Sequence, residues 1–180
     1  MKLEQTADGS YTLYVPELDE HYHSVKGALT ESQHIFIEMG LKHSPVSEPH
    51  ILEIGLGTGL NAFLTLLSAE ETRRKVHYTG IERYPLAEET LKQLDYPRLI
   101  GKQHEEDYYA IHQAPWDTET EVSPWFTLHK IEDDFTRLFN PVEAAALPFP
   151  YTISSTLMPS LPKNNPKCGN NLSSILYTRY

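Results

Sequence analysis

Acidic residues are missing from the end of this chain, since all 25 of them lie at or before Glu143. The chain also has a single cysteine, Cys168, which excludes an intrachain disulfide framework and a cysteine-rich metal site. No apolar run approaches the roughly 20 residues that span a bilayer, so no membrane-spanning helix is expected. Basic residues are few, and the formal net charge of −10 opposes non-specific binding to phosphate backbones.

The composition is typical of one folded domain. The 180 residues suffice for a single hydrophobic core, and 39% hydrophobic with 22% charged residues indicates a soluble globular protein. The amino-terminal stretch MKLEQTADGS lacks the apolar core of a signal peptide, so we expect a cytoplasmic location and no membrane partner. A nucleic-acid partner would need a local basic face, and the only candidate, RRK at 73–75, we interpret as exposed charge.

The pattern of apolar residues predicts strands that alternate with helices. Asp8-Gly9 separates two short alternating runs and predicts a β-hairpin. A helix is predicted from Gly27 to about Leu41, with these apolar residues on one side: Ala28, Ile35, Phe36 and Met39. Strands are expected at 50–55, 76–82 and 126–131, and helices after Gly59, at 85–94 and near 104–113. This order predicts a parallel α/β sheet with helices on both faces, preceded by the hairpin.

The stretch LEIGLGTGLN (52–61) has three glycines between a predicted strand and a predicted helix: Gly55, Gly57 and Gly59. Glycines in such a loop let backbone N–H groups approach a ligand closely. The loop lacks the Gly-Lys-Ser/Thr of a Walker A motif, and Leu60 breaks the dinucleotide pattern G-x-G-x-x-G. Glu82 ends the next predicted strand, where a carboxylate can accept both hydroxyls of a ribose. The two features together predict a site for a nucleoside-like ligand.

This arrangement resembles the cofactor site of class I S-adenosylmethionine methyltransferases. The resemblance implies S-adenosyl-L-methionine as the cofactor, with Glu53 at its methionine end and Glu82 at its ribose. It also implies an acid at the adenine amine, either Asp133 or Asp134. The expected cofactor-binding residues are Glu53, Gly55, Gly57, Gly59, Asn61, Glu82, Asp133 and Asp134. Plainer roles stay open, because Gly59 could merely allow helix packing and the Asp pair could be a solvated turn.

A narrower resemblance lies upstream of the glycine loop. EHYHSVKGALTESQHIFIEMGL (20–41), followed by ILEIGLGTGLNAF, resembles the tRNA 5-methylaminomethyl-2-thiouridine methyltransferase family of MnmD type. These proteins are the stand-alone relatives of the amino-terminal domain of the bifunctional enzyme MnmC. The match includes IERYP and FTLHKIEDD and extends from residue 1 to about 140. The residues that fall on the family's upstream pattern, with a substrate or lid role implied, are Tyr22, Ser24, Gly27 and Glu31.

The resemblance implies an activity and its partners. Family members methylate the exocyclic amine of 5-aminomethyl-2-thiouridine at the wobble position, in the anticodon loop of tRNA. A separate oxidase or another tRNA-modifying enzyme would supply that amine. Two other functions stay open, namely a small-molecule methyltransferase on the same fold and a non-catalytic cofactor-binding remnant.

Three histidines near the amino terminus invite a metal interpretation: His21, His23 and His34. Their spacing fits no closed zinc site, and no cysteines accompany them. We therefore expect no metal. Plain packing stays open as a role for His34.

The family's catalytic carboxylate has no counterpart in this chain. In the family it is the Asp of an FDAFAP motif, which holds the attacking amine and takes its proton. The stretch STLMPSLPKNNPKCGN (155–170) stands where that motif should be. The catalytic residue is therefore unknown, and we expect the chain as given to be inactive.

A shifted reading frame restores the motif. When the third base of each codon is joined to the first two bases of the next, residues 151–170 can read YDIIYFDAFAPEKQPEMWE. The Met158-Pro159 junction allows only Ala, and the Cys168-Gly169 junction allows only Trp or Arg, of which the family has Trp. The other junctions depend on a choice among synonymous codons. A natural low-complexity tail is the alternative, but it does not explain the hidden motif.

We therefore interpret the end of the chain as an out-of-frame translation of the family's own catalytic segment, which continues in the adjacent frame past Tyr180. The sequence predicts a Rossmann-like class I methyltransferase domain at 1–143 that is incomplete at its carboxyl end. The remaining segment, 144–180, is rich in Pro and Asn and is expected to be poorly ordered and to contribute no strand.

Overall fold

The computed structural model of the protein describes residues 1–135 and 152–155. The amino-terminal elements are β1 (Lys2–Gln5), β2 (Tyr11–Val15), β3 (Glu20–His21), the helix α1 (Ala28–Ser32) and the π-helix η1 (Gln33–Leu41). The elements that follow are β4 (His50–Ile54), α2 (Leu60–Thr72), β5 (Val76–Glu82), α3 (Glu88–Leu94), α4 (Tyr96–Ile100), η2 (Lys102–His104), α5 (Glu105–Gln113), β6 (Glu119–Ser123), β7 (Phe126–Glu132) and β8 (Thr152–Ser155).

The predicted amino-terminal hairpin is confirmed. β1 and β2 pair antiparallel around Gly9, whose φ of +83° lies in the left-handed region that glycine tolerates. The Asp8 carboxylate accepts the backbone N–H groups of Ser10 (3.0 Å) and Thr30 (2.8 Å), so it joins the turn to the start of α1. The structure adds β3, which pairs with β2 and completes a small three-stranded sheet. We call residues 1–27 the hairpin module.

The main sheet has the strand order β6-β7-β5-β4-β8. β7, β5, β4 and β8 run parallel, as the alternation of strands and helices predicts, and β6 pairs antiparallel with β7 at the edge. Ile54 lies level with Ile81 on β5, and Ile81 lies level with Ile131 on β7, so the three strands end together. The loops that follow these strands therefore meet at one edge of the sheet.

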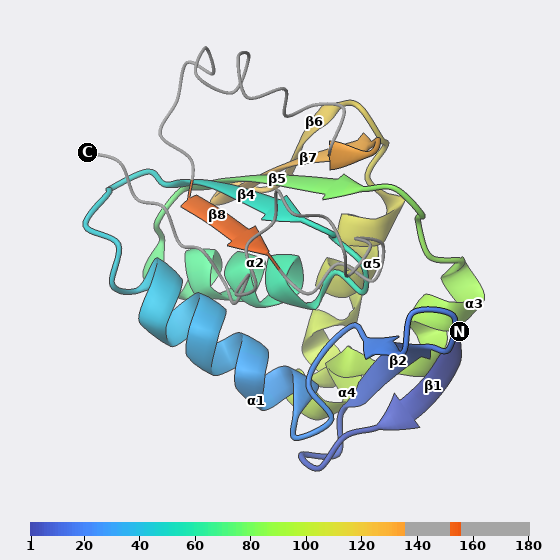
Figure 1. The fold of residues 1–180 in the computed structure, drawn as a ribbon. Helices are drawn as coiled ribbons and strands as arrows, with labels where there is room; N and C mark the ends of the chain where they lie inside the picture. Colours follow the sequence, from blue (N-terminus) through green and yellow to red (C-terminus); the bar gives the residue numbers. More distant parts are fainter. Residues whose placement is uncertain (136–151, 156–180) are drawn as a thin grey trace, which may run out of the picture.

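The helices α1, η1, α2 and α5 lie on one face of the main sheet (Figure 1). On β5 the residues Val76 and Tyr78 are buried, whereas the alternate residues His77 and Thr79 are only partly buried. α2 supplies the largest share of the core on this face, with Leu60, Phe63 and Leu66 buried. The sequence predicts helices on both faces of the sheet. The helices within residues 1–135 cover one face (Figure 1). The segment 136–151 lies outside the described residues.

The helix predicted from Gly27 forms, but the predicted inward side is partly wrong. Ile37 and Leu41 are buried, whereas Met39 is 52% exposed. The cause is the wider turn of η1, in which the Lys42 N–H donates to the Ile37 carbonyl, five residues back, at 2.9 Å. The wider turn changes the angle between successive side chains, so the spacing of an ordinary α-helix no longer identifies the buried face.

Other differences from the sequence prediction are local. α3 begins at Glu88 rather than at Pro85, and α4 and β6 are additional elements. The strand β8 lies inside 144–180, where the sequence predicts no strand, and it pairs in parallel with β4. The predicted boundary at residue 143 falls outside the described residues. No helix in the described part of the chain is both long enough and apolar enough to cross a bilayer.

Candidate functional site

A cavity of about 480 Å³ opens at the edge of the sheet where β4, β5 and β7 end. Its walls come from the hairpin module, the glycine loop after β4, and the residues that follow β5 and β7. Open α/β sheets bind ligands at this edge. The structure brings these predicted site residues together there: Tyr22, Glu53, Gly55, Gly57, Glu82, Asp133 and Asp134.

The remaining predicted site residues lie outside the cavity lining: Ser24, Gly27, Glu31, Gly59 and Asn61. Three of them, Ser24, Gly27 and Glu31, form the turn that leads into α1. The Ser24 N–H donates to the Glu31 carboxylate at 3.0 Å, and the Gly27 N–H donates to the Ser24 carbonyl at 3.1 Å. A side chain at Gly27 would collide with Asp8, because an added Cβ would lie 2.6 Å from Asp8 Oδ2. In this structure the turn is a support for the hairpin module rather than a wall of the cavity.

The glycine loop needs its glycines for backbone conformation. Gly55, Gly57 and Gly59 have φ angles of +83°, +50° and +70°, all in the left-handed region. The loop is also bound to the next strand, since the Gly55 N–H donates to the Ile81 carbonyl at 2.8 Å. Three left-handed residues in five produce a tight turn whose backbone lies at the cavity.

Glu53, the last residue but one of β4, is 1% exposed and hydrogen-bonded to neutral donors. Asn61 Nδ2 donates to Glu53 Oε1 at 2.8 Å, and the Tyr78 hydroxyl donates to Glu53 Oε2 at 2.7 Å. Burial and the nearby Glu53 charge raise the pKa of Tyr78 well above its usual value, so this hydroxyl stays a donor. Asn61 lies outside the cavity lining and contacts it through Glu53, whose carboxylate its side chain helps to hold.

Glu82, the last residue of β5, is bound to the glycine loop. Its Oε2 accepts the Gly57 N–H at 2.9 Å, and its Oε1 accepts the Tyr84 N–H at 2.8 Å. The carboxylate is buried but lines the cavity. Glu82 thus links the ends of β4 and β5 and presents a negative charge beside the loop.

The two candidate adenine acids have different partners. Asp134 Oδ2 lies 2.7 Å from Arg83 Nη1, which comes from the end of β5. Asp133 Oδ1 accepts the backbone N–H of Asp134 at 2.6 Å. Both residues line the cavity. The sequence could not choose between them, and the structure distinguishes them by these contacts.

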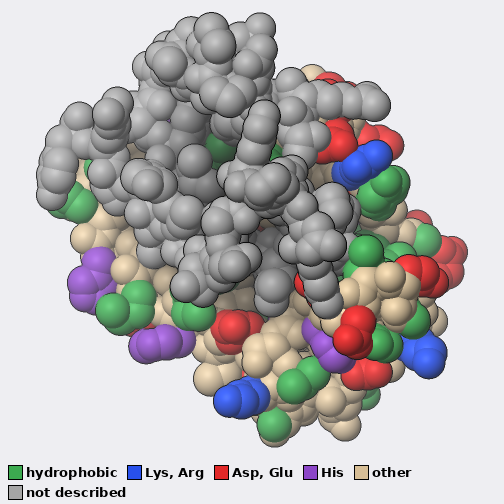
Figure 2. All heavy atoms as spheres, in the orientation of Figure 1, with side chains coloured by type: hydrophobic (Ala, Val, Ile, Leu, Met, Phe, Trp, Pro, Cys, Tyr) green, Lys and Arg blue, Asp and Glu red, His purple; other side chains and the backbone are tan. Residues whose placement is uncertain are grey.

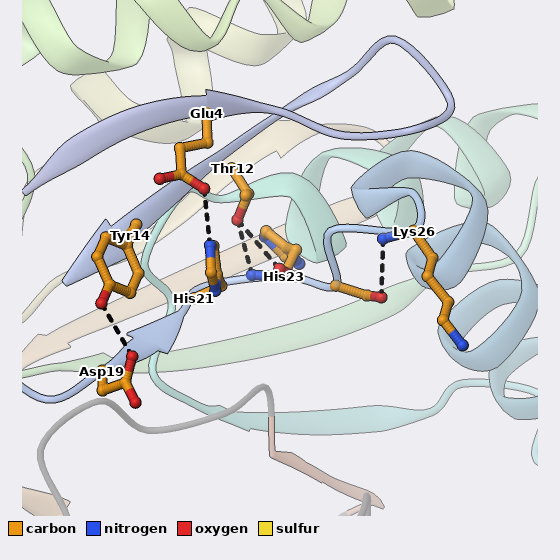
Figure 3. A network of polar contacts seen from close by, with 8 residues as sticks. Glu4, Thr12, Tyr14, Asp19, His21, His23 and Lys26 are labelled. Atoms are coloured by element: carbon orange, nitrogen blue, oxygen red, sulfur yellow. Dashed lines mark hydrogen bonds and ion pairs between the residues drawn. The ribbon is translucent and has the colours of Figure 1, made fainter. Parts of the chain in front are cut away.

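The hairpin module holds the glycine loop through two neighbouring residues. The Tyr22 ring lies against Gly57, where an added Cβ would be 2.8 Å from Tyr22 Cδ1. Burial, with a smaller effect of the Glu82 charge, raises the pKa of Tyr22 to about 12. His23 Nε2 lies 2.8 Å from Thr58 Oγ1. The His23 backbone N–H donates to Thr12 Oγ1 at 2.9 Å (Figure 3). Through His23, the glycine loop is thereby joined to β2, which lies at least 40 positions earlier in the sequence.

α5 supports the same loop from the helix side of the sheet. The Tyr108 hydroxyl donates to the Thr58 carbonyl at 3.1 Å. The His112 ring lies under Gly59, where an added Cβ would be 2.7 Å from both Cε1 and Nε2. Sequence reasoning did not identify either residue, because nothing in the local pattern of α5 indicates a contact with residues 58–59.

Several cavity residues were not predicted from the sequence. Arg83 and Tyr84 directly follow Glu82, so their position after a strand end was a usable signal. The hairpin module also contributes Met1, Val15, Glu17 and Leu18. No local motif indicates these four residues, because their approach to the cavity depends on how the module packs.

The amino-terminal histidines have separate surroundings. His21 Nε2 pairs with Glu4 at 2.9 Å (Figure 3), His23 faces Thr58, and His34 is exposed on η1. Within residues 1–135 and 152–155, no three His, Cys, Asp or Glu side chains are placed to hold a metal ion.

Comparison with known proteins supports the resemblance seen in the motifs. No protein-family model matches the chain. The tRNA 5-methylaminomethyl-2-thiouridine biosynthesis bifunctional proteins MnmC of Magnetococcus marinus and Cupriavidus metallidurans are both 34% identical to it, over 94 and 89 residues. These alignments cover 48% and 46% of the chain but only 14% and 13% of the relatives.

A solved structure supports the fold. The chain is similar to the crystal structure of MNMC2 from Aquifex aeolicus, with a TM-score of 0.64 and 23% identity. The match covers 87% of this chain and 49% of that one. The predicted Rossmann-like α/β fold is therefore confirmed.

Two histidines, the buried His23 and the partly buried His112, are expected to make the protein's stability depend on pH. Burial lowers the pKa of His23 to about 4, and burial with the Lys130 charge lowers that of His112 to about 4. The unfolded chain therefore binds more protons between about pH 6.5 and pH 4, so stability is complete above that window and falls as the pH drops through it. His23→Gln should make the slope of unfolding free energy against pH shallower, by at most about 1.4 kcal/mol per pH unit.

Urea unfolding from pH 4.5 to pH 7 measures this slope. His34→Gln changes an exposed histidine on η1 and serves as the control. An unchanged slope in His23→Gln, or an equal change in both variants, would contradict the role assigned to His23.

Gly9 and Gly59, which have similar φ angles, together test how tightly His112 packs against the glycine loop. Gly9→Ala adds a methyl group in open space at φ +83°, so only backbone strain of about 1–2 kcal/mol is expected. Gly59→Ala at φ +70° adds a collision with His112 and should cost clearly more. His112→Ala in the Gly59→Ala background should recover part of the difference. Urea midpoints measure these costs, and equal losses for the two glycines would show that His112 does not restrict Gly59.

Proposed function

We propose that this chain is an S-adenosylmethionine-dependent methyltransferase domain of the tRNA 5-methylaminomethyl-2-thiouridine type, which its motifs resemble and to whose relatives it is similar. Its proposed substrate is the 5-aminomethyl group of wobble 2-thiouridine in tRNA. The observation that carries the proposal is the chemistry of the cavity. The acids in its lining are Glu17, Glu53, Glu82, Asp133 and Asp134, and the only Lys or Arg among the described lining residues is Arg83.

An acidic cavity beside a glycine loop favours a cationic nucleoside over a phosphorylated one. The pyrophosphate of a dinucleotide would be repelled by these carboxylates, whereas the sulfonium and ammonium groups of S-adenosylmethionine would be attracted. We propose that Glu82, whose carboxylate lines the cavity and accepts the Gly57 N–H, also receives the ribose hydroxyls. Glu53 is more buried and lies beside the loop. The donors and acceptors that line the cavity therefore fit this cofactor.

The chemistry expected at the site is methyl transfer to an amine. The cofactor supplies an electrophilic methyl group, and the protein has to hold the amine in line with it. The amine must be neutral to attack, so a carboxylate that binds it and takes its proton is needed. In the family that group is the Asp of the missing motif, which we propose the end of the chain encodes out of frame.

The position of β8 supports this proposal. β8 pairs in parallel with β4, and Ser155 lies level with Ile54 at the sheet edge where the cavity opens. In the shifted frame the stretch Asp-Ile-Ile-Tyr-Phe begins at residues 152–153, and the Asp of the motif arises at the junction of Leu157 and Met158. A frame-corrected strand in the place of β8 would therefore end with that Asp close to the cavity.

The tRNA partner is proposed from the relatives and not from charge. On the face drawn in Figure 2 the visible Lys and Arg side chains lie apart from one another. The whole chain has a formal net charge of −10. We propose that recognition centres on the modified base itself, and that a separate enzyme supplies the aminomethyl group.

The coding DNA tests the frame. We predict that the frame adjacent to the present one encodes Asp-Ala-Phe-Ala-Pro across residues 157–162, because the forced Ala at Met158-Pro159 already agrees. Resequencing the gene from an independent preparation gives the answer. A stop codon in that frame before residue 162, or an open frame without the motif, would refute the frameshift.

Methyl transfer tests the function. The 180-residue chain should not transfer labelled methyl to tRNA that carries the aminomethyl group, whereas a frame-corrected chain should, because only the latter supplies the carboxylate. An Asp→Asn change in the restored motif is the matched control and should lower turnover by roughly 10²–10⁴-fold. Comparable turnover by both chains would place the catalytic group within residues 1–143. Transfer by neither would count against the proposed substrate.

A further inference from the structure

The ends of β5 and β7 bring together four cavity residues. Arg83 and Tyr84 directly follow β5, and Asp133 and Asp134 follow β7. The two strands are parallel neighbours whose last residues, Glu82 and Glu132, lie level with each other. Both pairs therefore begin at the same height on the sheet edge, and all four residues line the cavity.

An ion pair joins the two strand ends across this part of the cavity. Arg83 Nη1 lies 2.7 Å from Asp134 Oδ2, and the Arg83 guanidinium lies 5.0 Å from the centre of the Tyr84 ring. The Asp134 side chain is 16% exposed and the Arg83 side chain 44% exposed, so the carboxylate is the more enclosed partner. The planar guanidinium thus has a ring on one side and a carboxylate at one edge, which restricts where that carboxylate can lie.

The neighbouring acid is held differently. Asp133 Oδ1 accepts the Asp134 backbone N–H at 2.6 Å, so this carboxylate is directed toward its own turn. Asp134 is instead held by a charge on another strand. Of the two acids, Asp134 is the one whose position depends on a second side chain.

We propose that Arg83 is a positioning residue that sets base specificity at this end of the cavity, through its ion pair with Asp134. The inference rests on the proposed function, because it takes the ligand to be an adenosine-containing cofactor. A carboxylate accepts several hydrogen bonds, so Asp134 held by Arg83 can also receive the exocyclic amine of adenine. Arg83 holds that carboxylate in one orientation as a hydrogen-bond acceptor, so a purine with an oxygen in place of the amine is rejected.

Binding of two ligands that differ only in that group tests the assignment. The ligands are S-adenosylhomocysteine and its 6-oxo counterpart, which has hypoxanthine in place of adenine. The variants of the full chain are Arg83→Met, which keeps length but removes charge, and Arg83→Lys, which keeps charge. Arg98→Met is the matched control, since Arg98 pairs with Asp95 at 3.2 Å in an exposed ion pair outside the cavity lining. Calorimetry gives the affinities, and thermal melts verify folding.

The expected result is a change in the ratio of the two affinities. The unchanged chain should prefer the adenine ligand by at least about tenfold, the effect of one hydrogen bond to a charged group. Arg83→Met should lower that preference at least about fivefold by weakening the adenine ligand alone, Arg83→Lys should retain most of it, and Arg98→Met should leave it unchanged.

Two other outcomes would overturn the assignment. If Arg83→Met keeps the preference, or weakens both ligands equally, the ion pair only supports the loops. If the unchanged chain binds neither ligand, the proposed cofactor site is itself wrong. The unchanged chain thus separates a failure of the proposed function from a failure of the role of Arg83.

Discussion

The hydrogen bond from the Gly57 N–H to the Glu82 carboxylate joins the two central strand ends of the sheet. It requires Gly57 at φ +50°, because a side chain there would be strained and would meet Tyr22. It also requires Glu82 to be the last residue of β5, level with the loop. A charged acceptor strengthens such a bond, so the loop is held in a conformation that leaves its backbone at the cavity. Gly57 and Glu82 both line the cavity, so this bond fixes the position of the loop relative to β5 at the cavity wall.

Two further elements support the loop from either side. α5 contacts the glycine loop through Tyr108 and His112. The end of α5 is bound in turn to β7, because Lys130 Nζ donates to the His112 carbonyl at 2.6 Å. The hairpin module contacts the loop through Tyr22 and His23. The helix, the sheet and the hairpin module therefore all contact the same five-residue loop, 55–59, at the wall of the cavity.

The central strands, the glycine loop and the acid at the strand end could all be predicted from local patterns in the sequence. The predicted strands at 50–55, 76–82 and 126–131 agree with β4, β5 and β7 to within a residue. These features are local, because a short apolar run, a cluster of glycines and a carboxylate at the end of a run require no knowledge of distant residues. The same local signals carried the resemblance that the comparisons support.

The residues that surround the cavity, and the contacts that hold them, became known from the packing of distant segments. The sequence did not show that the hairpin module would supply a wall, or that Arg83 would pair with Asp134 instead of facing solvent. It also misplaced the inward side of η1, because the wider helical turn alters the spacing on which such a prediction rests. These outcomes depend on contacts between residues far apart in the chain, and the pattern of neighbours in a sequence contains little information about them.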